Sequence, residues 1–401
     1  MKPAPPIAGA APPREAGLFD GGPPLGLLRL WGRIGEGSRN VRRRALAVIL
    51  IGWLPLLVLA LLAQFNERPG VWTAFLHDAS AHARTLLVSP LLILAELICI
   101  PRLGAIAETF RTRGLVPASQ VADFDAILSG VMRLRDSWVA EAAAVVLAYL
   151  AAFVLVTFVP TSFLPDWHRG LSEGVQTRSL ASWWNALVSL PILLVLLFGW
   201  VWRWFLWNRF LWKVSRLDLR LVAAHPEGAA GLMFVGFSLR AFMIIGLAIG
   251  VLVAATELAH VLAGSAATPE QLAAVALATV VCVLLLFTAP LLAFTEPLLR
   301  TWRAAVISYG ALAQRVGQAF EDKWMHNPID EETAQPLATG DFSAVTDLYQ
   351  TTSLAYSLRL MPLDLRSLVA LAISTALPFG IVALALVPFD KVMDKLLGMF
   401  L

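Results

Sequence analysis

The amino-acid sequence predicts an all-α fold, a polytopic transmembrane helical bundle of about seven spans. The chain is 58% hydrophobic and 15% charged, with a mean hydropathy of +0.72, whereas soluble domains average about 45–50% apolar and about 25% charged residues. Seven apolar runs approach the ~20 residues that a helix needs to cross a bilayer. Basic residues alternate between the segments that connect these runs, as expected when successive loops lie on opposite sides of a membrane.

The apolar runs define the predicted spans in chain order. They cover residues 45–65, 85–104, 138–159, 184–206, 241–262, 272–297 and 367–388. The second run is the least regular because Pro90, Glu96 and Pro101 interrupt it, so a re-entrant or broken helix stays open there. Before the first run, residues 1–40 are rich in Pro, Ala and Gly and predict a disordered tail.

The basic residues predict an orientation. With the N-terminus placed in the cytoplasm, 25 of the 31 Lys and Arg residues fall on the inner side and six on the outer side. Tryptophans lie at both ends of the fourth run, at positions Trp183, Trp184, Trp200, Trp202, Trp204 and Trp207. We interpret them as anchors at the two membrane interfaces. The composition, rich in Ala, Leu and Arg, is typical of a multi-pass protein of a bacterial inner (plasma) membrane.

Two segments on the predicted inner side have helical patterns of their own. Residues 121–135 place Val121, Phe124, Val131 and Leu134 on one face, which predicts an amphipathic helix. This helix either lies on the membrane or extends the third span inward. Residues 301–366 form the longest polar stretch and contain a second amphipathic pattern at 341–352.

Two stretches 200 residues apart predict an internal repeat. Residues 90–96 read PLLILAE and residues 290–296 read PLLAFTE, so proline and glutamate coincide at the same offsets. The simplest organisation is a three-span repeat (41–160), a linker span (161–215) and a second, parallel three-span repeat (216–401). This arrangement is the one used by SWEET transporters, although no SWEET motif is present.

Glu96 and Glu296 are the first candidate functional residues, because an ionisable group inside a span usually faces a cavity or a partner. At matching positions they could form coupling sites for a proton or cation. The alternative is a structural role near the inner headgroups, in which Glu96 pairs with Arg102 and Glu296 pairs with Arg300, four residues away.

Four further residues are transport or coupling candidates. Pro90 and Pro290 each free a backbone carbonyl in a span, which can line an ion site, form a hinge or serve packing. Glu141 lies three residues into the third span, and Arg240 adjoins the fifth. Arg240 either pairs with a carboxylate such as Glu96, Glu141 or Glu296, or is an ordinary arginine at the inner membrane boundary.

Four of the six histidines, His77, His82, His168 and His260, fall on the predicted outer side. Whether they converge decides whether a metal site exists there, and we predict none. The chain contains no phosphate-binding loop, no H-E-x-x-H and no G-x-S-x-G, so the sequence predicts neither an enzyme nor a cofactor.

The leading hypothesis is therefore a transporter or channel for a small solute or ion. The alternative is a membrane-embedded scaffold or sensor that recruits cytoplasmic partners through the tail, the amphipathic helices and residues 301–366. The expected partners are the lipid bilayer and a small solute or ion, with a homo-oligomer left open. Nucleic acid is not expected, because no basic stripe with interleaved aromatics lies in a soluble segment.

Overall fold

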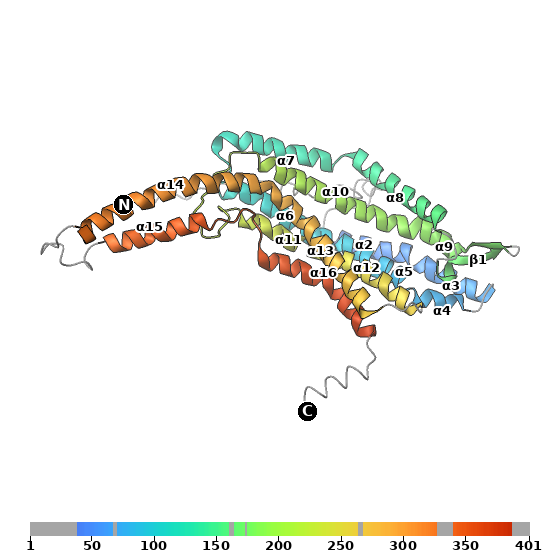
Figure 1. Cartoon of the computed structure of the whole chain (residues 1–401). Helices are drawn as coiled ribbons and strands as arrows, with labels where there is room; N and C mark the ends of the chain where they lie inside the picture. The colour runs from blue at the N-terminus through green and yellow to red at the C-terminus, as the bar shows by residue number, and fades with distance from the viewer. Residues whose placement is uncertain are drawn as a thin grey trace, which may run out of the picture.

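The computed structural model describes residues 38–66, 70–159, 164–172, 175–263, 268–326 and 340–386. Long helices run side by side and form an elongated bundle (Figure 1). A β-hairpin lies at one end of the bundle and a two-helix projection lies at the other (Figure 1), and we call these the strand end and the arm end. The predicted tail, residues 1–40, falls outside the described residues apart from its last three.

Within the described residues, seven helical stretches are long and apolar enough to cross a membrane, in agreement with the predicted number. They are Asn40–Phe65, Ala79–Thr112, Trp138–Phe158, Leu180–Val214, Met243–Leu262, Pro269–His326 and Leu365–Leu384. The second stretch is continuous over 34 residues, about 51 Å, so its prolines do not shorten it below the bilayer thickness. The chain is therefore a multi-pass integral membrane protein.

The first predicted half contains three spans. Its elements are α2 (Ser38–Gly52), α3 (Leu54–Asn66), α4 (Val71–His77), α5 (Ala79–His82), a π-helix (Ala83–Val88), α6 (Ser89–Thr112), a 3-10 turn (Ala118–Gln120), α7 (Val121–Arg135) and α8 (Trp138–Phe158). The predicted amphipathic helix at 121–135 is confirmed as α7. Its Phe124 and Val131 are 1% exposed, and α7 packs along α10 in line with α8 (Figure 1). It therefore continues the line of the third span and is packed against the bundle.

The strand end and the fourth span follow. Their elements are a 3-10 turn (Asp166–His168), β1 (Arg169–Ser172), β2 (Val175–Arg178), α9 (Leu180–Trp184), a π-helix (Asn185–Ser189) and α10 (Leu190–Val214). The two strands pair antiparallel, with Arg169 opposite Arg178.

The second predicted half contains the last three spans. Its elements are a 3-10 helix (Met233–Phe237), α11 (Ser238–Ala241), α12 (Met243–Leu262), α13 (Pro269–Thr288), a 3-10 helix (Ala289–Phe294), α14 (Thr295–Glu321), a π-helix (Asp322–His326), α15 (Asp341–Tyr356) and α16 (Leu365–Leu386). The pattern at 341–352 is confirmed as part of α15. We call α14, the π-helix after it and α15 the arm (Figure 1).

The bundle has an aromatic core toward the arm end. Phe110 of α6 contacts four phenylalanine rings, with centroid distances of 5.0–6.5 Å. These rings belong to Phe124, Phe210, Phe234 and Phe294, all 4% exposed or less. The interpretation of the tryptophans as interface anchors is wrong for Trp200 and Trp207, which are 4% and 0% exposed. They pack inside the protein because α10 is covered there by other helices.

The fifth and last spans are in close contact at two glycines. Gly246 and Gly250 of α12 face Thr375 of α16, and a Cβ atom at Gly246 would lie 2.6 Å from the Thr375 Oγ1. A Cβ atom at Gly250 would overlap the Thr375 carbonyl oxygen. Small residues four apart are what allows membrane helices to pack backbone against backbone.

The predicted repeat stays a prediction. The second and sixth spans both run from the strand end toward the arm end (Figure 1), as parallel halves require. The two matching stretches nevertheless differ locally, because residues 90–96 lie in the α-helix α6 whereas 290–294 form a 3-10 helix.

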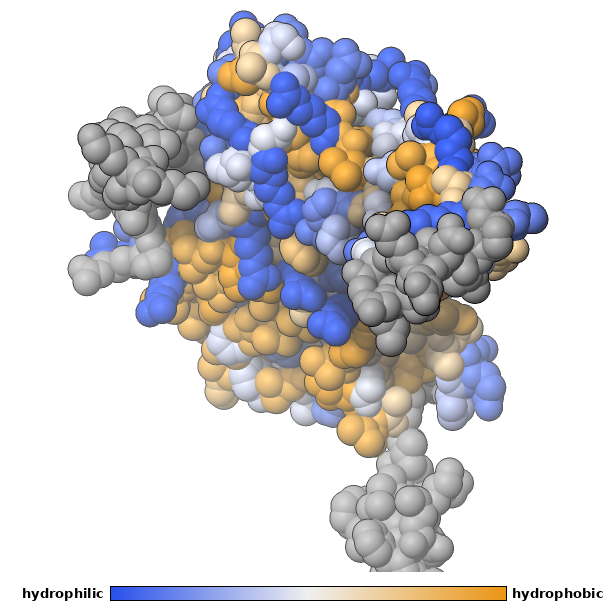
Figure 2. Space-filling model, turned by 90° about the vertical axis from the view of Figure 1, so that its left-hand side faces the viewer, coloured by the Kyte–Doolittle hydropathy of each residue, from blue (hydrophilic) through white to orange (hydrophobic). Residues whose placement is uncertain are grey.

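The outer surface of the spans is hydrophobic. Large apolar side chains are exposed on α8 and α16, such as Phe153 at 63% and Leu384 at 71%. Viewed from the arm end, polar residues gather over the upper part of the molecule and hydrophobic residues over the lower part (Figure 2). Such an exposed apolar surface is stable only in contact with lipid.

Candidate functional site

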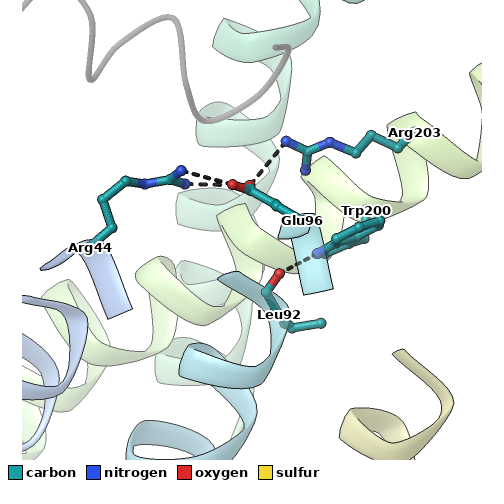
Figure 3. A network of polar contacts seen from close by, with 5 residues as sticks. All are labelled: Arg44, Leu92, Glu96, Trp200 and Arg203. Carbon is teal, nitrogen blue, oxygen red and sulfur yellow. Dashed lines mark hydrogen bonds and ion pairs between the residues drawn. The ribbon is translucent and has the colours of Figure 1, made fainter. Parts of the chain in front are cut away.

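A buried ion-pair network joins three spans at Glu96 of α6. The Glu96 carboxylate points between two guanidinium groups, Arg44 of α2 on one side and Arg203 of α10 on the other (Figure 3). Arg44 contacts both carboxylate oxygens, at 2.8 and 3.4 Å, and the Nη2 of Arg203 lies 3.1 Å from Oε1. Glu96 is 6% exposed and Arg203 is 2% exposed. Glu96 therefore pairs with Arg44 and Arg203 and not with Arg102, the partner expected from the sequence.

Neighbouring contacts hold this network in place. The Arg203 guanidinium lies 5.0 Å from the Trp200 ring centre, and the Trp200 indole donates a 2.8 Å hydrogen bond to the Leu92 carbonyl (Figure 3). Cys99, one turn after Glu96, packs with its thiol 2.6 Å from the Ala241 carbonyl. These contacts therefore tie α6 to the first and fourth spans and to α11, which precedes the fifth span.

The two glutamates of the predicted repeat are not equivalent. Glu296, at the start of α14, is exposed, with 64% of its side chain accessible, and pairs with Arg300. This is the pairing that the structural alternative for Glu296 predicts. Glu96, by contrast, is held between two arginines that come from distant parts of the sequence.

The other candidates lie apart from this network. Arg240 is exposed and pairs at 3.3 Å with Asp364, so the expectation of Glu96, Glu141 or Glu296 as its partner is wrong. Its backbone carbonyl accepts a 3.1 Å hydrogen bond from Arg102. Glu141 is buried in the first turn of α8, where the positive end of the helix dipole favours a carboxylate.

Both prolines mark changes in helix type. Pro90 is the second residue of α6, which begins directly after a π-helix, and Pro290 lies in the 3-10 helix between α13 and α14. Pro191 shows the same arrangement as Pro90, because α10 also begins after a π-helix. Proline lacks the N–H that would continue the preceding hydrogen-bond ladder, so these junctions are local consequences of the sequence.

Three of the four histidines that the sequence places on the predicted outer side converge. His77, His168 and His260 line a cavity of about 980 Å³ between α4, α5, α8, α9 and the end of α12, which we call the strand-end cavity. His82 does not line it and bonds to the Trp53 indole and the Phe75 carbonyl. Within the described residues, no group of three His, Cys, Asp or Glu side chains is arranged to hold a metal ion.

The histidine at position 168 is held neutral. Burial lowers its pKa to about 3, and the neighbouring Arg84 and Arg178 lower it as well, whereas Asp78 opposes the shift. One ring nitrogen lies 3.0 Å from the Ser182 hydroxyl. The folded protein therefore keeps an uncharged imidazole at pH values where an exposed histidine is protonated.

This histidine predicts acid sensitivity. Because the folded pKa is about 3 and the unfolded value is about 6.5, the unfolded chain takes up the proton first as the pH falls. Its contribution to stability is complete above about pH 6.5 and declines progressively toward pH 3. Melting temperatures in one detergent between pH 7.5 and 4.5 should fall more steeply for the wild type than for His168→Gln. Equal slopes would contradict the assignment.

Sequence reasoning missed Arg44 and Arg203 as the partners of Glu96. A signal was present for Arg203, since it is a charged residue inside the predicted fourth span, 184–206. No family model, curated protein or solved structure matches this chain.

Proposed function

We propose that this membrane protein is a membrane-embedded scaffold or sensor whose arm recruits a partner in the cytoplasm. The observation that carries the proposal is the arm itself. α14 is the second part of the sixth helical stretch, 27 residues and about 40 Å long, and it projects beyond the bundle with α15 beside it (Figure 1). The charge asymmetry of 25 to six basic residues supports a cytoplasmic arm end.

The arm is built to hold its shape. Gly310 and Gly317 of α14 face the hydroxyl groups of Tyr356 and Tyr349 of α15, so the two pairs share a seven-residue spacing. Near the tip, Phe342 packs against the Phe320 ring at a centroid distance of 4.9 Å. These contacts support a rigid antiparallel hairpin, which lowers the entropy that binding would cost.

The arm also exposes apolar side chains, although its polar sequence suggests that it lies in water and not in the bilayer. Ile307 is 74% exposed and Met325 is 70% exposed. Ile307 shares its face of α14 with the exposed Ala304 and Ala311. A face of small and apolar residues on a helix fits another helix better than a small solute, so the recruited partner is a helical protein segment.

The test compares two matched variants of the full chain in its own membranes. Ile307→Glu places a charge on the exposed apolar face, and Gln350→Glu places the same charge at an exposed polar position of α15. A photocrosslinking residue at position 311 should capture a cytoplasmic partner in the wild type and in Gln350→Glu but not in Ile307→Glu. Crosslinking only to a second copy of the chain, or equally in both variants, would contradict recruitment.

A transporter or channel is the second candidate, favoured by the strand-end cavity. Its lining comes from both predicted halves and from the linker span, including Asp78, Asn185 and Thr256. The exposure of Glu296 speaks against paired coupling carboxylates. Flux of small anions or protons into liposomes that contain the protein, above the flux into empty liposomes, would favour transport over the scaffold.

A further inference from the structure

The strand-end cavity carries an excess of positive charge. Its charged lining consists of three arginines and two aspartates. Arg169 is paired with Asp166 at 3.0 Å. The carboxylate of Asp78 already accepts hydrogen bonds from the Ala81 amide and, at 3.0 Å, from the Trp167 indole.

Arg84 and Arg178 are the two remaining cations. Among the described residues, neither has a carboxylate within ion-pair distance. Arg84 donates from Nε to the Ser80 carbonyl, and Arg178 donates from one Nη to the carbonyls of Val156 and Val159. Each guanidinium has five N–H donors, so each retains donors beyond these bonds. An anion in the cavity would satisfy them.

Part of the cavity lining is apolar. Leu155 and Val156 come from the end of α8, Leu190 from the start of α10 and Leu262 from the end of α12. These positions are span ends, where a bilayer changes from hydrocarbon to headgroup. A volume of about 980 Å³ is also far larger than a free inorganic anion needs. The lining therefore suits a molecule with an anionic head and an apolar portion.

We infer that the strand-end cavity binds the phosphate group of an anionic amphiphile, with Arg84 and Arg178 as its ligands. Guanidinium groups match phosphate oxygens with two parallel charge-assisted hydrogen bonds, which makes arginine the favoured residue for this recognition. The inference does not rest on the proposed function of the arm, because none of these residues lies on α14 or α15.

The test measures binding to the purified full chain in a neutral detergent. The probes are dioctanoyl phosphatidic acid, dioctanoylglycerol and inorganic phosphate, and the readout is the shift in melting temperature as each is titrated. Phosphatidic acid should stabilise the wild type, and dioctanoylglycerol should bind at least about tenfold more weakly. Arg84→Gln and Arg178→Gln should each weaken phosphatidic acid binding by about tenfold or more, the loss expected for a hydrogen bond to a charged group.

Controls distinguish a lipid from a soluble phosphate as the ligand, and both from the absence of binding at Arg84 and Arg178. Arg300→Gln, which lies on the arm and touches no cavity residue, should bind phosphatidic acid as the wild type does. Inorganic phosphate binding as tightly as phosphatidic acid would identify a soluble phosphate as the ligand, and much weaker binding would identify a lipid. If Arg84→Gln does not fold, Arg178→Gln decides. Unchanged affinity in a folded glutamine variant, or no phosphatidic acid binding, would overturn the inference.

Discussion

Replacing Gly250 with leucine is expected to prevent α12 and α16 from packing and to lower the yield of folded protein severely. Even a single Cβ atom at this position would overlap the backbone carbonyl of Thr375, which cannot rotate away as a side chain can. Overpacking a well-packed core costs about 1–3 kcal/mol, and more where backbone must move. Thermal unfolding in detergent, followed by size-exclusion chromatography, measures the loss.

A matched control for this prediction lies on the partner helix. Gly380 of α16 has no heavy atom within 4 Å of the position that a Cβ would occupy, and it is exposed on the bundle surface. The free energy of unfolding of Gly380→Leu should therefore lie within about 0.5 kcal/mol of the wild-type value. Similar melting temperatures for the two leucine variants would show that α12 and α16 are not packed this closely.

Glu96→Gln is expected to have the second large effect, a loss of about 3–5 kcal/mol in the free energy of unfolding. The change removes the negative charge between the Arg44 and Arg203 guanidinium groups, whose side chains are only 10% and 3% exposed, so the two cations are left to repel each other with little contact with water. Chemical or thermal unfolding of the two purified proteins in the same detergent measures the difference.

The repeat supplies the control for this prediction. Glu296→Gln removes a carboxylate of the same predicted motif, but its side chain is 64% exposed and its partner Arg300 is 76% exposed. Exposed ion pairs contribute at most about 1 kcal/mol, so this variant should resemble the wild type. In addition, the double variant Glu96→Gln/Arg203→Gln should lose less stability than the two single losses added together. Equal stability of Glu96→Gln and Glu296→Gln would refute the network.

The local features of this protein were predictable because they depend on residues close together in the chain. The helix at 121–135 appears with the predicted bounds, since its apolar period of 3.6 residues reveals both its type and its buried face. The pairing of Glu296 with Arg300 followed for the same reason, because residues four apart meet on one helix surface. The closeness of α12 to α16 also has a sequence signal, the small residues Gly246 and Gly250 spaced four apart.

The partners of Glu96 could not be predicted in this way. Arg44 is 52 residues away and Arg203 is 107 residues away, and the contact requires three helices to turn particular faces toward one point. Proximity along the chain favoured Arg102, which instead bonds to the Arg240 carbonyl. The convergence of His77, His168 and His260 on one cavity depends in the same way on how four segments meet at the strand end.

The sequence by itself therefore determined residence in a membrane, the seven spans and the local helices between them. These follow from hydropathy and from short-range periodicity, because the bilayer thickness and the helix geometry are the same for every chain. Only the tertiary structure decided which charges are buried together, which tryptophans face protein and where a cavity opens. Those outcomes depend on the rotation and register of helices distant in sequence. This dependence explains why the two similar stretches, 90–96 and 290–296, end in glutamates with different surroundings. Glu96 lies between two arginines, whereas Glu296 is exposed.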